Sequence, residues 1–72
     1  MPTASPELRA IWHDHPDGGD FAAQAFLRER GFKLTRGWQW IKPTPNHQIT
    51  QEEMNAIDYL VYEWDFDGVV IP

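Results

Sequence analysis

A chain of 72 residues that contains no cysteine must hold its fold together without disulfides and without a thiolate-bound zinc ion. A domain this short buries only about 60% of its unfolded surface, and its core rarely supplies more than about 3–5 kcal/mol of net stability. The chain has four Trp, four Phe and two Tyr, and each aromatic ring buries roughly 150–250 Å². We therefore expect one domain, residues 1–72, with an aromatic core.

A first short helix is expected between Ser5 and Trp12. Serine suits the N-cap, the proline after it suits the first helical position, and the next residue is acidic. Leu8, Ile11 and Trp12 then recur with the spacing of one helical stripe. A loop rich in proline and glycine follows this helix.

A second helix is predicted over roughly Phe21 to Arg30, with Asp20 as its N-cap. Gly31 stands where a left-handed residue ends a helix in a Schellman motif, and this motif would bring Leu27 into contact with Phe32.

The segment from Phe32 to Lys42 is predicted to form a β-hairpin. A three-residue loop, Thr35-Arg36-Gly37, puts glycine at the third position, where a type I turn followed by a bulge needs a positive φ. The same loop puts one apolar set on a single face: Phe32, Leu34, Trp38 and Trp40. A two-residue loop at residues 36–37 would divide this set between two faces. We therefore predict a positive φ at Gly37 and place Trp38 and Trp40 on the core side.

The start of a third helix is the clearest local signal. Residues 50–53, Thr-Gln-Glu-Glu, have the pattern of a capping box, and Ile49 and Met54 occupy the two positions of a hydrophobic staple. An apolar stripe continues to about Trp64: Met54, Ile57, Leu60, Val61 and Trp64.

A turn is predicted at residues 67–68, and residues 69–71 suit a short strand at the hairpin edge. The expected fold class is α+β: two short N-terminal helices, a β-hairpin with a possible third short strand, and a C-terminal amphipathic helix.

One cluster in the sequence has metal-ligand chemistry: His13-Asp14-His15, with Asp17 and Asp20 nearby. Metal ligands need fixed partners, whereas this loop is rich in glycine and proline. We interpret it as a solvated turn and expect no metal and no cofactor. No arrangement of Ser, Cys and His matches a known catalytic triad, so we expect a protein that is not an enzyme.

Residues 27–32, followed by a tight hairpin, resemble the start of HicA-type toxins, which have a double-stranded-RNA-binding-like fold. In that family a Gly-Ser-His element after the turn carries the catalytic histidine. The equivalent stretch here is Gly37-Trp38-Gln39-Trp40, which contains no histidine. We therefore expect no ribonuclease activity.

Charge is distributed unevenly in this chain, whose formal net charge is −5. Residues 28–42 contain five basic residues and one acid, whereas residues 43–72 contain six acids and no Lys or Arg. Glu63, Asp65 and Asp67 lie at or beyond the negative end of the third helix, where carboxylates are unfavourable. We interpret these acids as a partner-binding surface, and a face that only maintains solubility is the alternative. Trp12 and Trp64 are the candidate aromatic residues of this surface, and at least one of the two rings is expected to stay partly exposed.

Small size, an acidic surface, an exposed aromatic ring and no catalytic residues together resemble the early regulatory proteins of bacteriophages. Several of these bind host RNA polymerase and redirect or block transcription. The resemblance implies a monomeric regulator or inhibitor in the host cytoplasm, with a protein partner that presents a basic surface. The longest apolar runs are far shorter than the ~20 residues of a membrane helix, so no membrane partner is expected.

Two alternatives remain. One is a nucleic-acid-binding module that uses the basic hairpin, and its residues are Arg28, Arg30, Lys33, Arg36 and Lys42. The other is an acidic decoy of the anti-restriction or anti-CRISPR type. The positions of Trp38 and Trp40 discriminate between the protein-binding regulator and the nucleic-acid-binding module, because a hairpin that buries both rings has no stacking platform for bases.

Overall fold

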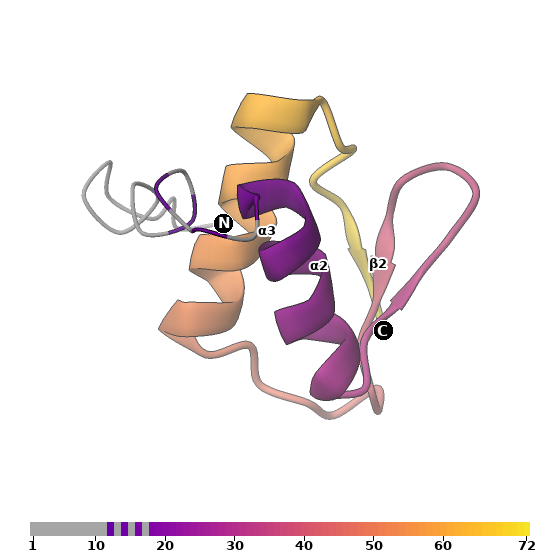
Figure 1. Ribbon diagram of the computed structural model, residues 1–72. Helices are drawn as coiled ribbons and strands as arrows, with labels where there is room; N and C mark the ends of the chain where they lie inside the picture. The colour runs from indigo at the N-terminus through magenta and orange to yellow at the C-terminus, as the bar shows by residue number, and fades with distance from the viewer. Residues whose placement is uncertain (1–11, 13, 15, 17) are drawn as a thin grey trace.

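The computed structural model describes residues 12, 14, 16 and 18–72 (Figure 1). Two helices, α2 (Gly19–Glu29) and α3 (Gln51–Trp64), pack side by side and run in opposite directions. Three short strands form one sheet: β1 (Lys33–Leu34), β2 (Trp40–Ile41) and β3 (Val70–Ile71). The α+β class is as predicted, and a third strand is present. The first predicted helix lies outside the described residues except for Trp12.

The sheet has the order β1-β2-β3 and is mixed. β1 and β2 are antiparallel, with Leu34 opposite Trp40, whereas β2 and β3 are parallel, with Trp40 opposite Val70. Parallel neighbours cannot be joined by a tight turn and need a crossover connection, usually a helix. Because α3 lies between β2 and β3 in the chain, it supplies that crossover.

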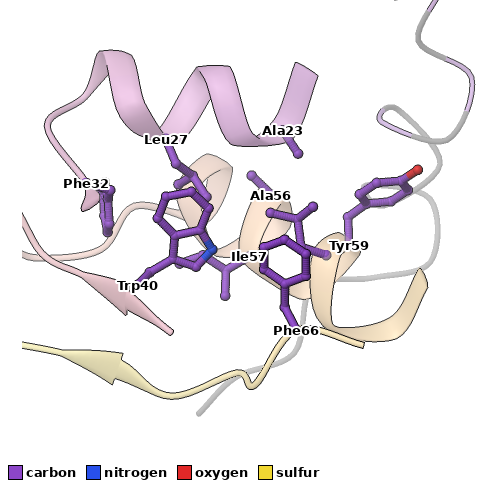
Figure 2. Packing of buried hydrophobic residues seen from close by; sticks show 9 residues of the cluster. Ala23, Leu27, Phe32, Trp40, Ala56, Ile57, Tyr59 and Phe66 are labelled. Carbon is purple, nitrogen blue, oxygen red and sulfur yellow. The ribbon is translucent and has the colours of Figure 1, made fainter. Parts of the chain in front are cut away.

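The core lies between the two helices and the sheet (Figure 2). Trp40 is 2% exposed, and its ring stacks with Phe66 at a centroid distance of 6.5 Å. The other buried members of the cluster are Ala23, Leu27, Phe32, Ala56, Ile57, Tyr59 and Leu60. The cluster draws on α2, the residue after its Schellman glycine, β2, α3 and the residue after α3's C-cap, so the core ties these elements together.

The end of α2 is a Schellman motif, as predicted. The N–H of Phe32 donates to the carbonyl of Leu27 at 3.0 Å, and the N–H of Gly31 donates to that of Arg28 at 3.0 Å. Gly31 has φ of 94°, the left-handed conformation that glycine adopts without steric cost. Leu27 and Phe32 are both buried in the core cluster.

The start of α2 differs from the prediction. The helix begins at Gly19, its N-cap is Gly18 without a side-chain hydrogen bond, and Asp20 lies inside the first turn. Asp20 as N-cap is therefore wrong. A Cβ atom on Gly19 would lie 2.6 Å from Cζ of Tyr59. Close packing against α3, rather than a capping side chain, accounts for glycine in this turn.

The start of α3 is the predicted capping box. Thr50 Oγ1 accepts from the N–H of Glu53 at 3.2 Å, and Glu53 Oε1 accepts from the N–H of Thr50 at 2.9 Å. Residues 53–60 are then all buried, which is more than two helical turns. Along this stretch α3 is a central helix, not the one-sided amphipathic helix that the apolar stripe predicted.

The hairpin loop is shifted by one residue from the prediction. The N–H of Thr35 donates to the carbonyl of Gln39 at 2.8 Å, so the three-residue loop is Arg36-Gly37-Trp38. Trp38 has φ of 62°, and Gly37 is not among the residues with positive φ. Trp38 is also 55% exposed. The predictions of a positive φ at Gly37 and of Trp38 in the core are therefore wrong.

Contacts within the hairpin and with the segment after α3 explain this register. The Trp38 ring lies 5.1 Å from the Phe66 ring, and the Trp38 carbonyl accepts from the N–H of Asp67 at 3.1 Å. Thr35 Oγ1 accepts from the N–H groups of Gly37 and Gln39, each at 3.2 Å. These interactions offset a left-handed tryptophan backbone, which costs roughly 1–2 kcal/mol.

Replacing Thr50 with Ala removes the capping acceptor and should lower the free energy of unfolding by about 0.5–2 kcal/mol. Chemical denaturation measures the loss. Gln51→Ala, at the exposed first residue of α3, is the matched control and should change stability by less than about 0.5 kcal/mol. Equal effects of the two substitutions would show that the capping box does not stabilise α3.

Trp38→Gly should be more stable than Trp38→Ala by about 1 kcal/mol, because only glycine relieves the left-handed backbone while both remove the ring. The order is the reverse of the usual one, in which alanine is the more stable residue. Arg36 has no positive φ, so Arg36→Gly should not be more stable than Arg36→Ala. Denaturant melts of the four variants test this, and a more stable Trp38→Ala would contradict it.

Candidate functional site

A cleft of about 420 Å³ lies where the hairpin loop meets the start of α2 and the end of α3. Its volume falls in the range of roughly 300–1,000 Å³ that is typical of ligand-binding pockets. Six residues line it: Asp20, Gln24, Trp38, Trp64, Asp65 and Phe66. Three segments that are distant in sequence therefore meet at one concave surface.

Two half-exposed tryptophans form part of the cleft wall. Trp64 is 51% exposed, and its Nε1 donates to the hydroxyl oxygen of Tyr59 at 3.2 Å. Trp38 packs on Phe66, which is itself buried against Trp40. Each ring is thus fixed on one side by the protein and open on the other, which is the state of an aromatic residue ready to make an intermolecular contact.

The cleft carries negative charge. Asp20 lies in the first turn of α2, and Asp65 is the C-cap of α3. The last turn of α3 contains no basic residue, so the partial negative charge of the helix terminus is not compensated locally. Carboxylates and helix carbonyls together favour a positively charged group at this position.

Backbone strain is concentrated at the same place. Among the described residues, two that are not glycine have a positive φ, Trp38 at 62° and Asp65 at 58°. Both line the cleft. Left-handed conformations of bulky residues persist only where the surroundings enforce them, and such residues cluster at binding sites.

The structure brings only some of the sequence-predicted partner-binding residues together. Trp64 and Asp65 line the cleft, whereas Glu63 and Asp67 are exposed beside it in sequence but do not line it. Trp12 is half-buried and packs against Phe26 with the ring centroids 5.3 Å apart. It therefore contributes to the hydrophobic packing of α2 rather than to the cleft.

Sequence reasoning missed four lining residues, namely Asp20, Gln24, Trp38 and Phe66. Asp20 was interpreted as a helix cap and Trp38 as a core residue. The choice of hairpin register decided the second error, because a shift by one residue moves Trp38 from a strand into the loop. A bulky residue in the loop position normally taken by glycine is visible only once the register is known.

The basic residues of the hairpin region differ in their surroundings. Arg30 contacts Glu52 and Glu53 and lies over the Phe26 ring at 4.3 Å, and Lys42 Nζ donates to the carbonyl of His47 at 3.2 Å. The other three, Arg28, Lys33 and Arg36, are exposed. Trp40 is buried but Trp38 is 55% exposed, so the hairpin keeps one of the two rings that could stack on a base.

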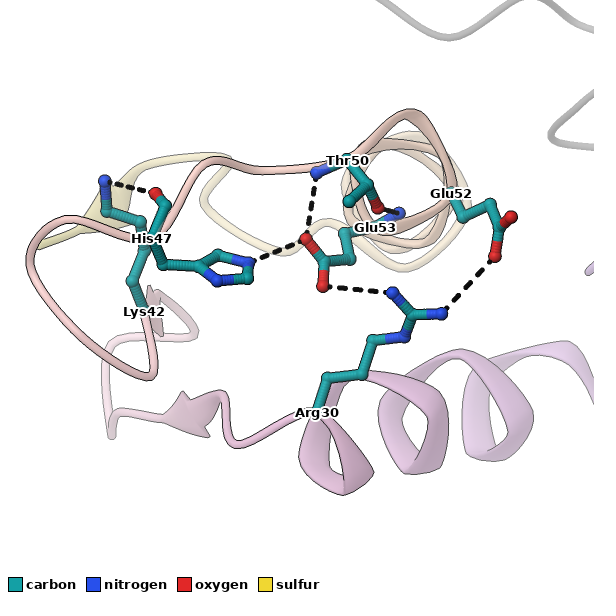
Figure 3. A network of polar contacts seen from close by, with 6 residues as sticks. All are labelled: Arg30, Lys42, His47, Thr50, Glu52 and Glu53. Atoms are coloured by element: carbon teal, nitrogen blue, oxygen red, sulfur yellow. Dashed lines mark hydrogen bonds and ion pairs between the residues drawn. The ribbon is translucent and has the colours of Figure 1, made fainter.

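A second polar cluster surrounds the carboxylate of Glu53, which is 1% exposed (Figure 3). Arg30 Nη1 donates to its Oε2 at 3.3 Å, and His47 Nε2 lies 2.8 Å from its Oε1. An ionised carboxylate only accepts, so Nε2 of His47 carries the proton in this contact. With the Thr50 N–H, the cluster joins α2 and the loop before α3 to the first turn of α3, which is a structural role.

The pKa of Glu53 reflects opposing causes. Burial by itself raises it, while hydrogen bonds from the Thr50 N–H, His47 and Arg30 and the charge of His47 lower it, and the net result is a pKa below the usual value of 4.5. A lowered pKa stabilises the fold above pH 4.5, and this contribution is lost as the pH falls through the pKa of the folded state.

The described residues contain no group of three or more His, Asp or Glu side chains that could hold a metal ion. His13, His15 and Asp17 of the sequence cluster lie outside them. Within the same part of the chain, neither helix is long and apolar enough to cross a membrane.

Glu53→Gln should reduce the free energy of unfolding at pH 7 by about 1.5–3 kcal/mol, because it replaces charge-assisted hydrogen bonds to a buried group. It should also flatten the fall in stability below pH 4.5, since the amide does not titrate.

Denaturant melts across pH 3–7 measure both effects of this substitution. Glu52→Gln is the matched control, because Glu52 contacts the same arginine at 3.4 Å but is 75% exposed. It should change stability by less than about 0.5 kcal/mol. If the stability of the Glu53→Gln variant fell below pH 4.5 as steeply as that of the parent, the lowered pKa of Glu53 in the folded state would be contradicted.

Comparison with known proteins gives one family. A family model described as "Phage Pam3 gp59 related protein" matches residues 1–72. No curated protein and no solved structure matches the chain.

Proposed function

The chain belongs to the family of phage Pam3 gp59-related proteins, and on that premise we propose that it is a small non-enzymatic regulator that binds a basic surface of a host protein. The resemblance to phage early regulatory proteins makes host RNA polymerase the favoured partner. Binding in the host cytoplasm would then inhibit or redirect transcription.

The observation that carries this proposal is the pairing of two half-exposed tryptophans with carboxylates at one cleft. Tryptophan is enriched among the residues that dominate the binding energy of protein interfaces. Carboxylates around such an anchor attract a basic partner surface, speed the encounter and select the orientation of binding.

The surrounding charge supports the same conclusion. Glu63, Asp65 and Asp67 are all exposed at the end of α3, where the helix dipole disfavours them. A sequence selected for stability alone would place Lys or Arg here. Retention of three acids is explained if they serve association with a basic surface.

Neutralising these acids by the triple substitution Glu63→Gln, Asp65→Asn and Asp67→Asn should slow association with purified bacterial RNA polymerase and reduce its salt dependence. The fold should be as stable as the parent or slightly more so. Asparagine tolerates the left-handed backbone at position 65, and at position 67 it keeps the oxygen that accepts from the N–H of Val69.

Association rates at two salt concentrations, together with a denaturant melt, test this prediction. A charge-matched control neutralises three exposed acids elsewhere, Asp14, Glu29 and Glu52, and should retain the parent's response. No association of the parent with the polymerase would overturn the choice of partner. Association that is unchanged in the triple variant would overturn the acidic surface.

A further inference from the structure

We propose that the cleft between Trp38 and Trp64 binds one arginine side chain of the protein partner. The inference rests on the proposed function and adds the chemical group that the site recognises. The lining of the cleft supports it, because three aromatic side chains, two carboxylates and one amide meet there.

The aromatic walls favour a flat cation. The face of a tryptophan ring attracts cations more strongly than the rings of the other aromatic residues, and guanidinium also stacks on such a face. Trp38 and Trp64 are each half-exposed and line the same hollow. A lysine ammonium is compact and strongly hydrated, so it gains less from this contact than a guanidinium does.

The charges at the cleft select the sign of the ligand. Asp20 and Asp65 are acceptors for guanidinium N–H groups, and a charge-assisted pair of this kind is stronger than a neutral hydrogen bond. The C-terminal end of α3 adds partial negative charge without a basic residue in its last turn. A phosphate or carboxylate ligand would be repelled, and an apolar ligand would desolvate the two acids without compensation.

The cleft is also held in place before binding. Trp64 is hydrogen-bonded to Tyr59, and Trp38 is held by Phe66 and by the N–H of Asp67. The left-handed conformations of Trp38 and Asp65 keep both residues at the cleft at a cost to the fold. A preformed site spends less binding energy on ordering its side chains.

Nuclear magnetic resonance of the full chain tests the inference, because the four tryptophans give four indole N–H signals. The probes are the blocked tripeptide Gly-Arg-Gly, its lysine and citrulline counterparts, and a short oligothymidylate. We expect the arginine peptide to shift the indole signals of Trp38 and Trp64 and not that of buried Trp40. Citrulline has nearly the same shape without the charge and should bind about 2- to 10-fold more weakly.

Matched variants locate the binding. Asp65→Asn and Trp64→Ala should each lower the affinity for the arginine peptide by about 2- to 10-fold. Glu29→Gln and Phe21→Ala remove an exposed acid and an exposed ring that do not line the cleft, and they should leave its affinity unchanged.

Three results would overturn the inference: equal binding of the citrulline peptide, shifts caused by the oligonucleotide instead of the arginine peptide, or no shift of Trp38 and Trp64. The last result, with salt-dependent polymerase binding still present, rejects the arginine site and leaves the proposed function standing. Arginine binding at the cleft without polymerase binding supports the arginine site and rejects RNA polymerase as the partner.

Discussion

The buried carboxylate of Glu53 joins three segments of the chain at one polar cluster. It completes the capping box with Thr50, accepts from Arg30 at the end of α2, and contacts His47 in the loop that precedes α3. Because all these contacts satisfy one charge, burial of that charge is tolerated. These contacts join α2 to the start of α3, and the other end of α3 carries Trp64 to the cleft, where its Nε1 donates to the hydroxyl of Tyr59.

Local rules predicted the parts of this fold that depend on neighbours in sequence. The Schellman end of α2 and the capping box of α3 could be predicted because the contacts of each motif lie within about six residues of sequence. The hairpin register was not, because Phe66 and Asp67 hold Trp38 from outside the hairpin. The sequence indicated Trp64 and Asp65 at the site. It missed the lining residues that only the tertiary fold brings there: Asp20, Gln24, Trp38 and Phe66.

The cleft and the core make opposite demands on aromatic residues. Trp40 and Phe66 are enclosed and stack on each other, whereas Trp38 packs on the same Phe66 yet stays half-exposed. Phe66 is therefore shared between the core and the cleft wall. A substitution at Phe66 would disturb both, so binding variants are more informative at the outer rings, where the loss of a contact can be separated from loss of the fold.

The two tryptophan walls of the cleft stand on supports of unequal rigidity. Trp64 ends a helix whose residues 53–60 are buried, while Trp38 lies in the loop between two strands of two residues each. Short ladders open locally at a much lower free energy than a buried helix does. Both walls are in place in the folded protein, but local opening of the hairpin removes the Trp38 wall while α3 still holds Trp64.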